Sequence, residues 1–379
     1  MMTPTRCATI RDARRRTPPR RRRRFLRIAS SLERVDAATY ASRVASRILR
    51  HDSGADGVMP GAVYDSTLAC VARVRDVRSC VVSMHDRGFH RGAAAFDAAT
   101  IVEGTAHLLE THAARLAKNC RAGGICANHI DVEALTRVVR ETIEVSEVRF
   151  GQVRVYATSG SDGVNFSLCD AGGDRDDADV FVVAYEKKLP TCAASGDVDD
   201  DAVGLSAFVS DVPIKHPRFA RMKTVNYLNN VLLARDARDR GVDVGVFATS
   251  DGCVGEAPGA NLAFLTADGT LATPARDDVL AGITIARVME LAEKEENAVA
   301  LAAVGVRRIE DAARVSLDVP LAARECMLVG SAANVQGITS WNGEIVGDGR
   351  VGPATKLLAR LLLSDMFAGT QRLERPMVF

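Results

Sequence analysis

The chain has 379 residues, enough for two domains or one large one, and its hydrophobic content of 47% is ordinary for a globular protein. No run approaches the roughly eighteen apolar residues of a transmembrane helix, so the sequence predicts no membrane span. The nine cysteines are scattered and form no C-x-x-C pair or zinc-type cluster. We therefore expect reduced thiols and no metal site.

Residues 1–30 differ from the rest of the chain in charge. They hold eleven arginines and one acid, Asp12, while the whole chain has a net charge of +1. The remaining 38 basic and 47 acidic residues give a net charge of −9. An Arg-rich, acid-poor start is typical of a disordered organelle transit peptide. A nucleic-acid-binding arm is the alternative, but the acidic remainder argues against a nucleic-acid partner.

The first half of the chain has strand-like segments with a few helix-like segments between them, after a predicted helix over 31–50 and a loop over 51–60. In chain order the patterns predict strands over 68–74 and 79–84, a turn at 85–88, a strand over 95–102, a helix over 112–122 capped by Thr111, a helix over 132–145 capped by Asp131, and strands over 152–158 and 180–185.

A polar stretch over 187–201 with Pro190 and four aspartates reads as an interdomain linker. It separates a predicted small domain, 62–186, from a large one, 202–379; residues 31–61 would be an N-terminal extension. The second half predicts strands over 203–210, 244–249 and 327–329, a hairpin over 262–265 and 271–273, and helices over 224–240 (ended by Gly241), 283–295 and 353–366. Without strict alternation, the fold class is α+β.

Lys223 and Glu256 are the residues most suggestive of chemistry. A desolvated lysine amine is a nucleophile that forms imines and moves protons. A carboxylate such as Glu256, in a Gly-rich loop, can keep a pyridine nitrogen protonated, which makes the ring an electron sink. Each residue alone is more often an ordinary surface charge.

A helix start, a segment that follows a strand, and one arginine could each bind an anion. Gly282-Ile283-Thr284 offers free N–H groups and a hydroxyl where a helix begins, and Gly330-Ser331-Ala332 follows a strand. Arg115 could add a charge-assisted contact. Other constellations are weaker: the aspartates over 174–179 lack calcium-loop spacing, and no G-x-S-x-G accompanies the serines.

Several short segments follow one another along the chain in a characteristic order. They are His85 to Phe89, Phe96-Asp97, His112 to Leu116, Lys223 to Asn230, Gly255-Glu256, Leu280 to Thr284, Gly330 to Ala333 and Gly347 to Pro353. Together they resemble the fold-type IV pyridoxal-phosphate enzymes over about residues 62–368. Within this group, the chain is most similar to the plant and algal branch of D-amino-acid aminotransferases and aminodeoxychorismate-lyase-like proteins. Such proteins are plastid-targeted, which favours chloroplast over mitochondrion.

The resemblance implies a small two-layer α/β domain, a larger pseudo-barrel domain and a homodimer. It implies pyridoxal 5'-phosphate as cofactor, with Lys223 as the Schiff-base lysine and Glu256 at the pyridine nitrogen. The phosphate would be held by Arg115, Ile283, Thr284, Ser331 and Ala332. Leu280 would pack against the ring and Tyr227 would approach its hydroxyl.

The substrate side departs from the family pattern. Where bacterial D-amino-acid enzymes place an arginine for the substrate carboxylate, this chain reads Ser159-Gly160. Arg91 and Arg154 are candidates to hold that carboxylate, and either could equally form a structural ion pair. Phe89 and Ser159 complete the candidate substrate-binding residues.

The function expected on this resemblance is transamination from an amino acid, with D-alanine-type donors favoured, to a 2-oxo acid such as 2-oxoglutarate. A 4-amino-4-deoxychorismate lyase and a branched-chain aminotransferase remain alternatives, because they use the same intermediate. A cofactor carrier without catalysis is a hypothesis of another class, which the Lys223 and Glu256 pair disfavours.

Overall fold

The computed structural model describes Ser42 and residues 60–66, 70–74, 81–125, 130–160, 179–188 and 203–369. Residues 48–379 form one compact unit, to which the following description is confined. The transit-like segment, the predicted helix over 31–50 apart from Ser42, the loop over 51–59 and the linker beyond Lys188 lie outside the described residues. These assignments and the domain boundaries stay predictions.

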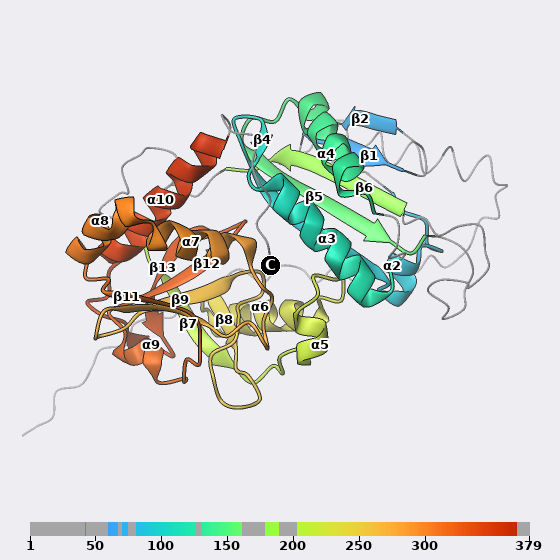
Figure 1. Cartoon of the computed structure of the whole chain (residues 1–379). Coiled ribbons are helices and arrows are strands. Elements are labelled where there is room, and N and C mark those ends of the chain that lie inside the picture. Colours follow the sequence, from blue (N-terminus) through green and yellow to red (C-terminus); the bar gives the residue numbers. More distant parts are fainter. Residues whose placement is uncertain are drawn as a thin grey trace, which may run out of the picture. The chain divides into compact units, whose positions relative to one another are not determined.

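The first half of the unit is a six-stranded antiparallel sheet covered on one face by two helices (Figure 1). The strand order is β2 (Cys70–Val74), β1 (Gly61–Asp65), β6 (Asp179–Glu186), β5 (Gly151–Thr158), β3 (Ala94–Val102) and β4 (Thr105–Ala106). Helices α3 (Leu109–Gly123) and α4 (Val132–Ser146) bury Val153, Val155 and Ala157 of β5. Because side chains alternate along a strand, Gln152, Arg154 and Tyr156 lie on the opposite face. We call this face the open face.

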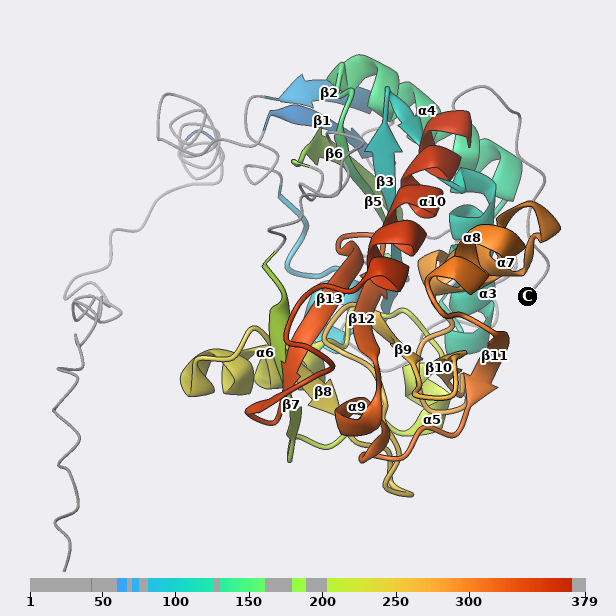
Figure 2. The same ribbon diagram turned by 90° about the vertical axis from the view of Figure 1, so that its left-hand side faces the viewer.

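The second half is an eight-stranded mixed sheet. Its order is β11 (Arg308–Ala313), β10 (Thr270–Pro274), β9 (Asn261–Leu265), β12 (Glu325–Gly330), β13 (Asn334–Trp341), β7 (Leu205–Ser210) and β8 (Val244–Phe247), with β14 (Glu344–Ile345) paired to β13. The helical elements of the unit besides α3 and α4 are α2 (Arg87–Arg91), α5 (Pro217–Ala220), α6 (Leu228–Arg240), α7 (Ile283–Glu293), η3 (Glu295–Asn297), α8 (Ala298–Ala303), α9 (Val319–Ala322) and α10 (Pro353–Gly369). Figure 2 shows α10 running along the β12–β13 side of this sheet.

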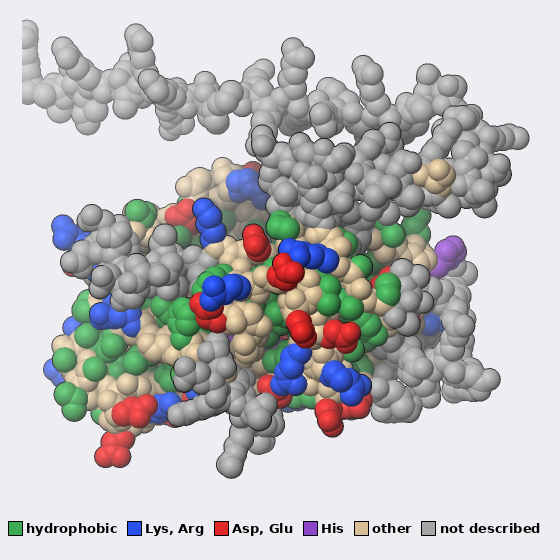
Figure 3. All heavy atoms as spheres, turned by 90° about the horizontal axis from the view of Figure 1, so that it is seen from above, with side chains coloured by type: hydrophobic (Ala, Val, Ile, Leu, Met, Phe, Trp, Pro, Cys, Tyr) green, Lys and Arg blue, Asp and Glu red, His purple; other side chains and the backbone are tan. Residues whose placement is uncertain are grey.

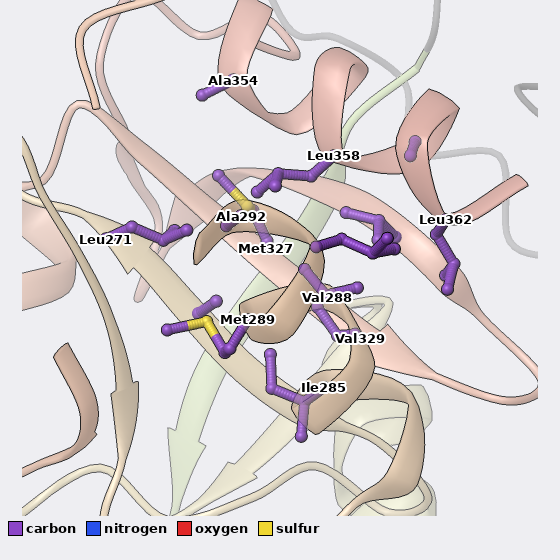
Figure 4. Close-up of a cluster of buried hydrophobic side chains, with 14 of the residues drawn as sticks. Leu271, Ile285, Val288, Met289, Ala292, Met327, Val329, Ala354, Leu358 and Leu362 are labelled. Carbon is purple, nitrogen blue, oxygen red and sulfur yellow. The ribbon is translucent and has the colours of Figure 1, made fainter. Parts of the chain in front are cut away.

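The core of the second half lies between α7, α10 and the sheet (Figure 4). Met289 of α7, Leu358 of α10 and Met327 of β12 pack together there. Val102, from the first sheet, belongs to the same buried cluster. The two sheets therefore share apolar packing, and the α+β class predicted from the sequence is confirmed.

Several predicted elements are confirmed and others are wrong at their starts. Helix α4 begins after Asp131, whose carboxylate accepts from the Glu133 N–H at 2.9 Å, as predicted. The hairpin of β9 and β10 is also confirmed. Helix α3, however, begins at Leu109 after Leu108 in a left-handed conformation, so Thr111 is buried inside the helix and does not cap it.

Near the first sheet, the sequence missed one strand and predicted one that is absent. Strand β1 was not predicted, and residues 81–84 of the strand predicted over 79–84 are not extended into a sheet. The turn predicted at 85–88 leads into α2, whose first N–H groups are capped by Asp86. An Asp N-cap is a strong signal for a helix start, and the prediction of a turn at this position did not include it.

Helix α6 begins at Leu228, four residues later than predicted. The start of the intervening segment instead pairs with β3: the Phe96 N–H donates to the Lys223 carbonyl at 2.9 Å, and the Val225 N–H donates to the Ala94 carbonyl at 3.1 Å. Tertiary pairing thus overrides the helical spacing. The same pairing fixes the backbone of Lys223 against the first sheet.

The described surface carries both signs of charge. On the face shown in Figure 3, basic and acidic side chains are interspersed rather than gathered by sign. No helix of the described residues is long and apolar enough to cross a membrane. Among the same residues, no cluster of His, Cys, Asp and Glu has the composition of a metal site.

Candidate active site

A polar pocket lies between the two sheets, close to strand β3 of the first sheet. It encloses about 410 Å³ of space that no atom fills, including the open solvent at its mouth. Its lining includes most of the cofactor residues predicted from the sequence: Arg115, Lys223, Tyr227, Glu256, Leu280, Ile283, Thr284 and Ser331. Chain segments far apart in the sequence therefore meet at one cavity.

Lys223 presents its amine to this pocket. Its Nζ donates to the Tyr227 hydroxyl at 3.2 Å and lies 4.8 Å from the centre of the Phe96 ring. Burial, reinforced by the positive charge of Arg115, lowers the pKa of Lys223 to about 8. A lysine of lowered pKa has a larger fraction of free amine near neutrality, which suits a nucleophile or a base.

Glu256 lies at another side of the pocket with its carboxylate buried. One oxygen, Oε2, accepts from the Leu280 N–H at 3.0 Å. Burial raises the pKa of Glu256, and this effect is opposed by the Leu280 bond and by the charges of Lys215 and Lys223. The carboxylate is therefore suited to pair with a cationic nitrogen that enters the pocket.

Arg115 is locked in place by a buried carboxylate. Its Nε and Nη2 each donate to Asp97 at 2.7 Å, and its Nη1 donates to the Ala281 carbonyl at 2.8 Å. Asp97 also accepts from Nδ1 of His112 at 2.8 Å. Burial alone would raise the pKa of Asp97, but Arg115 and His112 outweigh it and hold that pKa well below its usual range. Of the five N–H groups of a guanidinium, two remain for an anion in the pocket.

The start of α7 and the turn after β12 form the anion-binding end. Gly282, Ile283 and Thr284 line the pocket with the first N–H groups of the helix, which have no partner within the helix. The Thr284 and Ser331 hydroxyls lie 3.0 Å apart. With the N–H groups of Arg115 they offer converging donors, as expected of a phosphate site.

Three neighbours of this pocket received no role from the sequence. Asn230 lines it with a buried Oδ1 that has no hydrogen-bond partner among the described residues, while its Nδ2 donates to the Pro258 carbonyl. Asn261 donates to the Leu280 carbonyl at 2.9 Å, and a Cβ on Gly282 would lie 1.9 Å from its Oδ1. Phe96 contacts Lys223. In the sequence, the only signal that pointed to these positions was the occurrence of Asn and Gly residues beside the predicted motifs.

Ala332 and the predicted substrate residues do not line this pocket. Ala332 is exposed, and its carbonyl accepts from Nζ of Lys187 at 3.3 Å. Phe89 is 69% exposed and lines a separate apolar hollow on the open face, together with Val81 and Val82. Arg91 is exposed and donates to the His90 carbonyl.

Ser159 and Arg154 lie at different parts of the first sheet. Ser159 is buried; its hydroxyl has no partner in the part of the chain that the structure describes, and its carbonyl accepts from Arg87 at 2.9 Å. Arg154 lies on the open face; its Nε donates to Gln152 at 3.1 Å and its guanidinium carbon is 5.5 Å from the Tyr185 ring centre. Of these two, Arg154 has the geometry to receive a carboxylate.

Comparison with known proteins decides the family. The model of the amino-transferase class IV family matches residues 94–341. The chain belongs to the class IV aminotransferases. The chloroplastic D-amino-acid transaminase of Arabidopsis thaliana is 31% identical over 313 residues, which cover 81% of this chain and 77% of that protein. The D-alanine aminotransferase of Bacillus licheniformis is 24% identical over 79% of this chain and 97% of its own length.

Solved structures agree on the fold of this class IV aminotransferase. The branched-chain amino acid aminotransferase of Thermobaculum terrenum, in its PLP-containing holo form, superposes with a TM-score of 0.66 at 20% identity. The match covers 82% of this chain and 95% of that one. The protein is thus an enzyme with the fold-type IV architecture, and enzymes of this class use pyridoxal phosphate.

Proposed function

We propose that the enzyme transfers the amino group of a D-amino acid such as D-alanine to a 2-oxo acid such as 2-oxoglutarate, with pyridoxal 5'-phosphate held in the pocket around Lys223. The observation that carries this proposal is the convergence in one cavity of a buried amine, a buried carboxylate and an anion-binding end. The donor is supported by the two D-amino-acid relatives.

The residues of the pocket fit this cofactor. Arg115, Thr284 and Ser331 have the donors for a phosphate group, and the buried carboxylate of Glu256 suits a protonated ring nitrogen. The orphan Oδ1 of Asn230 is a further acceptor facing the cavity. Pyridoxal phosphate, when bound, supplies an aldehyde that takes up the amino group and a ring that stabilises negative charge beside it.

Lys223 would carry out the proton transfers. Its amine, with a pKa lowered to about 8 by burial, would take the proton from the substrate α-carbon and hold it until it is returned. The Tyr227 hydroxyl, 3.2 Å from Nζ, orients the amine. Burial, followed by the charge of Glu256, raises the pKa of Tyr227, so this hydroxyl stays protonated and can donate in turn.

The decisive assay gives purified protein D-alanine, L-leucine or aminodeoxychorismate in parallel, with and without 2-oxoglutarate. We expect pyruvate from D-alanine only when 2-oxoglutarate is present, and none with Lys223→Ala. Pyruvate from aminodeoxychorismate without an acceptor would instead identify a lyase. Oxo-acid release from L-leucine alone would identify a branched-chain enzyme.

We also propose a homodimer that buries the apolar hollow of the open face. Val81, Val82 and Phe89 are 60%, 50% and 69% exposed there, and contiguous exposed apolar side chains favour association. Light scattering should give twice the chain mass for the wild type and a lighter species for Phe89→Asp. A monomeric wild type would contradict the proposal.

A plastid location is the last part of the proposal. It is supported by the Arg-rich residues 1–30 and by the chloroplastic relative. Residues 1–30 fused to a fluorescent protein should direct it to plastids. Fluorescence confined to mitochondria or the cytosol would count against this location.

A further inference from the structure

Two cations on the open face have no carboxylate partner among the described residues. Arg154 belongs to β5, and Lys187 directly follows β6, the neighbouring strand. The half-buried ammonium of Lys187 makes one hydrogen bond, to the Ala332 carbonyl at 3.3 Å. Tyr185, two residues before Lys187, carries the guanidinium carbon of Arg154 at 5.5 Å from its ring centre. In keeping with this placement, burial and then the charge of Arg154 lower the pKa of Lys187. Like charges held close together are unfavourable until an anion joins them.

The guanidinium of Arg154 is held through its Nε atom. Gln152 is buried, and its Oε1 accepts from the Tyr185 hydroxyl at 2.6 Å and from Nε of Arg154 at 3.1 Å. Neither Nη group of Arg154 donates to any described residue. A guanidinium fixed through Nε presents its two Nη groups as a fork for a carboxylate.

Lys187 lies beside the turn that follows β12, and β5, which carries Arg154, is linked to the same turn through its neighbour β3. Lys187 contacts the carbonyl of Ala332, and the Thr100 hydroxyl donates to the carbonyl of the preceding residue, Ser331, at 2.6 Å. Thr100 pairs with Gln152 across the strands, and Ala98 pairs with Arg154. Lys187 therefore lies beside the turn that lines the pocket at Ser331, and Arg154 follows the strand partner of Thr100 by two residues along β5.

We propose that Lys187 joins Arg154 in a two-cation site that makes the enzyme prefer dicarboxylic over monocarboxylic 2-oxo acids as acceptors. This inference rests on the proposed function and adds a specificity-determining residue to it. Two adjacent positive charges match two carboxylates, whereas a monocarboxylic acid leaves one of them unneutralised. Lys187 takes no part in the proton transfers.

The test measures binding of unreactive acids to the enzyme loaded with pyridoxal phosphate. Glutarate carries two carboxylates and butyrate one, and titration calorimetry gives the affinity of each. Because hydrogen bonds to charged groups are strong, we expect Lys187→Met to weaken glutarate binding at least about tenfold and butyrate binding no more than about twofold. Lys187→Arg should retain the preference. Lys188→Met removes an exposed lysine next along the chain and is the matched control.

Steady-state kinetics give a second readout on the same variants. With D-alanine as donor, the KM for 2-oxoglutarate should rise about tenfold in Lys187→Met, while the KM for the monocarboxylic 2-oxobutyrate and both kcat values stay near the wild type. Equal loss of glutarate and butyrate binding, or no difference between the Lys187 and Lys188 variants, would overturn the inference. If the wild type releases no oxo acid from any donor, the proposed function fails instead. The calorimetric comparison still stands in that case.

Discussion

Arg115 and Arg154 both belong to the first half of the unit, yet their guanidinium groups are held in opposite ways. Arg115 is buried and donates hydrogen bonds to both oxygens of Asp97 and to the Ala281 carbonyl, so only part of its N–H groups remains for the pocket. Arg154 is exposed and is fixed through Nε alone. The first arrangement preorganises a cation for a ligand that stays bound, and the second leaves a fork for ligands that exchange. Substitutions in the pocket and on the open face should therefore differ in the size of their effects.

The largest effect is expected at Asp97. Its replacement by Asn leaves the buried charge of Arg115 without its partner, which costs about 3–5 kcal/mol of unfolding free energy. Urea denaturation of the apoprotein measures this loss. The control is Asp239→Asn in the exposed pair of Arg235 and Asp239, where we expect about 0–1 kcal/mol. Similar losses in both variants would show that burial does not make the pair of Arg115 and Asp97 stronger than an exposed ion pair.

At the anion-binding end, Thr284→Val should weaken pyridoxal phosphate binding about 10- to 100-fold. The variant loses the hydroxyl that faces Ser331, and hydrogen bonds to charged groups are worth about 1.5–3 kcal/mol. Absorbance titration of the apoprotein measures the Kd. Thr284→Ser keeps the hydroxyl and should bind nearly as the wild type does. A Thr284→Val protein of unchanged Kd would show that this end does not hold the phosphate.

Lys223 makes the stability of the apoprotein depend on pH. Burial lowers its pKa to about 8, against 10.5 for the ordinary value, so the unfolded chain binds the proton more tightly. Below pH 8 both states are protonated and the folded state bears the full cost of the buried charge. That cost is relieved as pH rises from 8 to 10.5.

Lys223→Met should therefore stabilise the apoprotein by about 1–3 kcal/mol below pH 8, with the gain vanishing above pH 10.5. Denaturation curves at pH 7, 9 and 10.5 follow it. Lys118→Met, at an exposed lysine of α3, is the control. A gain that does not change with pH would mean that packing, rather than charge, causes it.

The smallest effect is expected on the open face, at Tyr185. Tyr185→Phe removes the hydroxyl that donates to Gln152 but leaves Arg154 bonded to the same oxygen. We expect a loss of about 1 kcal/mol in stability and a rise of about two- to tenfold in the KM for 2-oxoglutarate. Tyr64→Phe, on β1, serves as the control. An unchanged KM would show that Gln152 does not need this bond to position Arg154.

The cofactor side could be anticipated from the sequence because its residues lie in short local motifs. Thr284 follows Gly282 at a helix start, and Glu256 follows Gly255, so spacing along the chain carries the signal. The confirmed Asp131 cap is of the same local kind.

The substrate side could not be anticipated because its contacts join distant strands. Arg154 lies on β5 and Lys187 follows β6, two strands that pair only in the folded sheet, and the late start of α6 depends on pairing between Lys223 and β3. Local spacing does not report such register, so Lys187 and Asn230 received no role and Arg154 could not be separated from Arg91.

The central claim is that Lys223 is the covalent anchor of the cofactor. Borohydride reduction of the enzyme loaded with pyridoxal phosphate, followed by peptide mass spectrometry, identifies the lysine that is joined to it. We expect one pyridoxyl group per chain, on the peptide that contains Lys223, and none in Lys223→Ala. A label on Lys215 or Lys187 in the wild type, or no label at all, would contradict it.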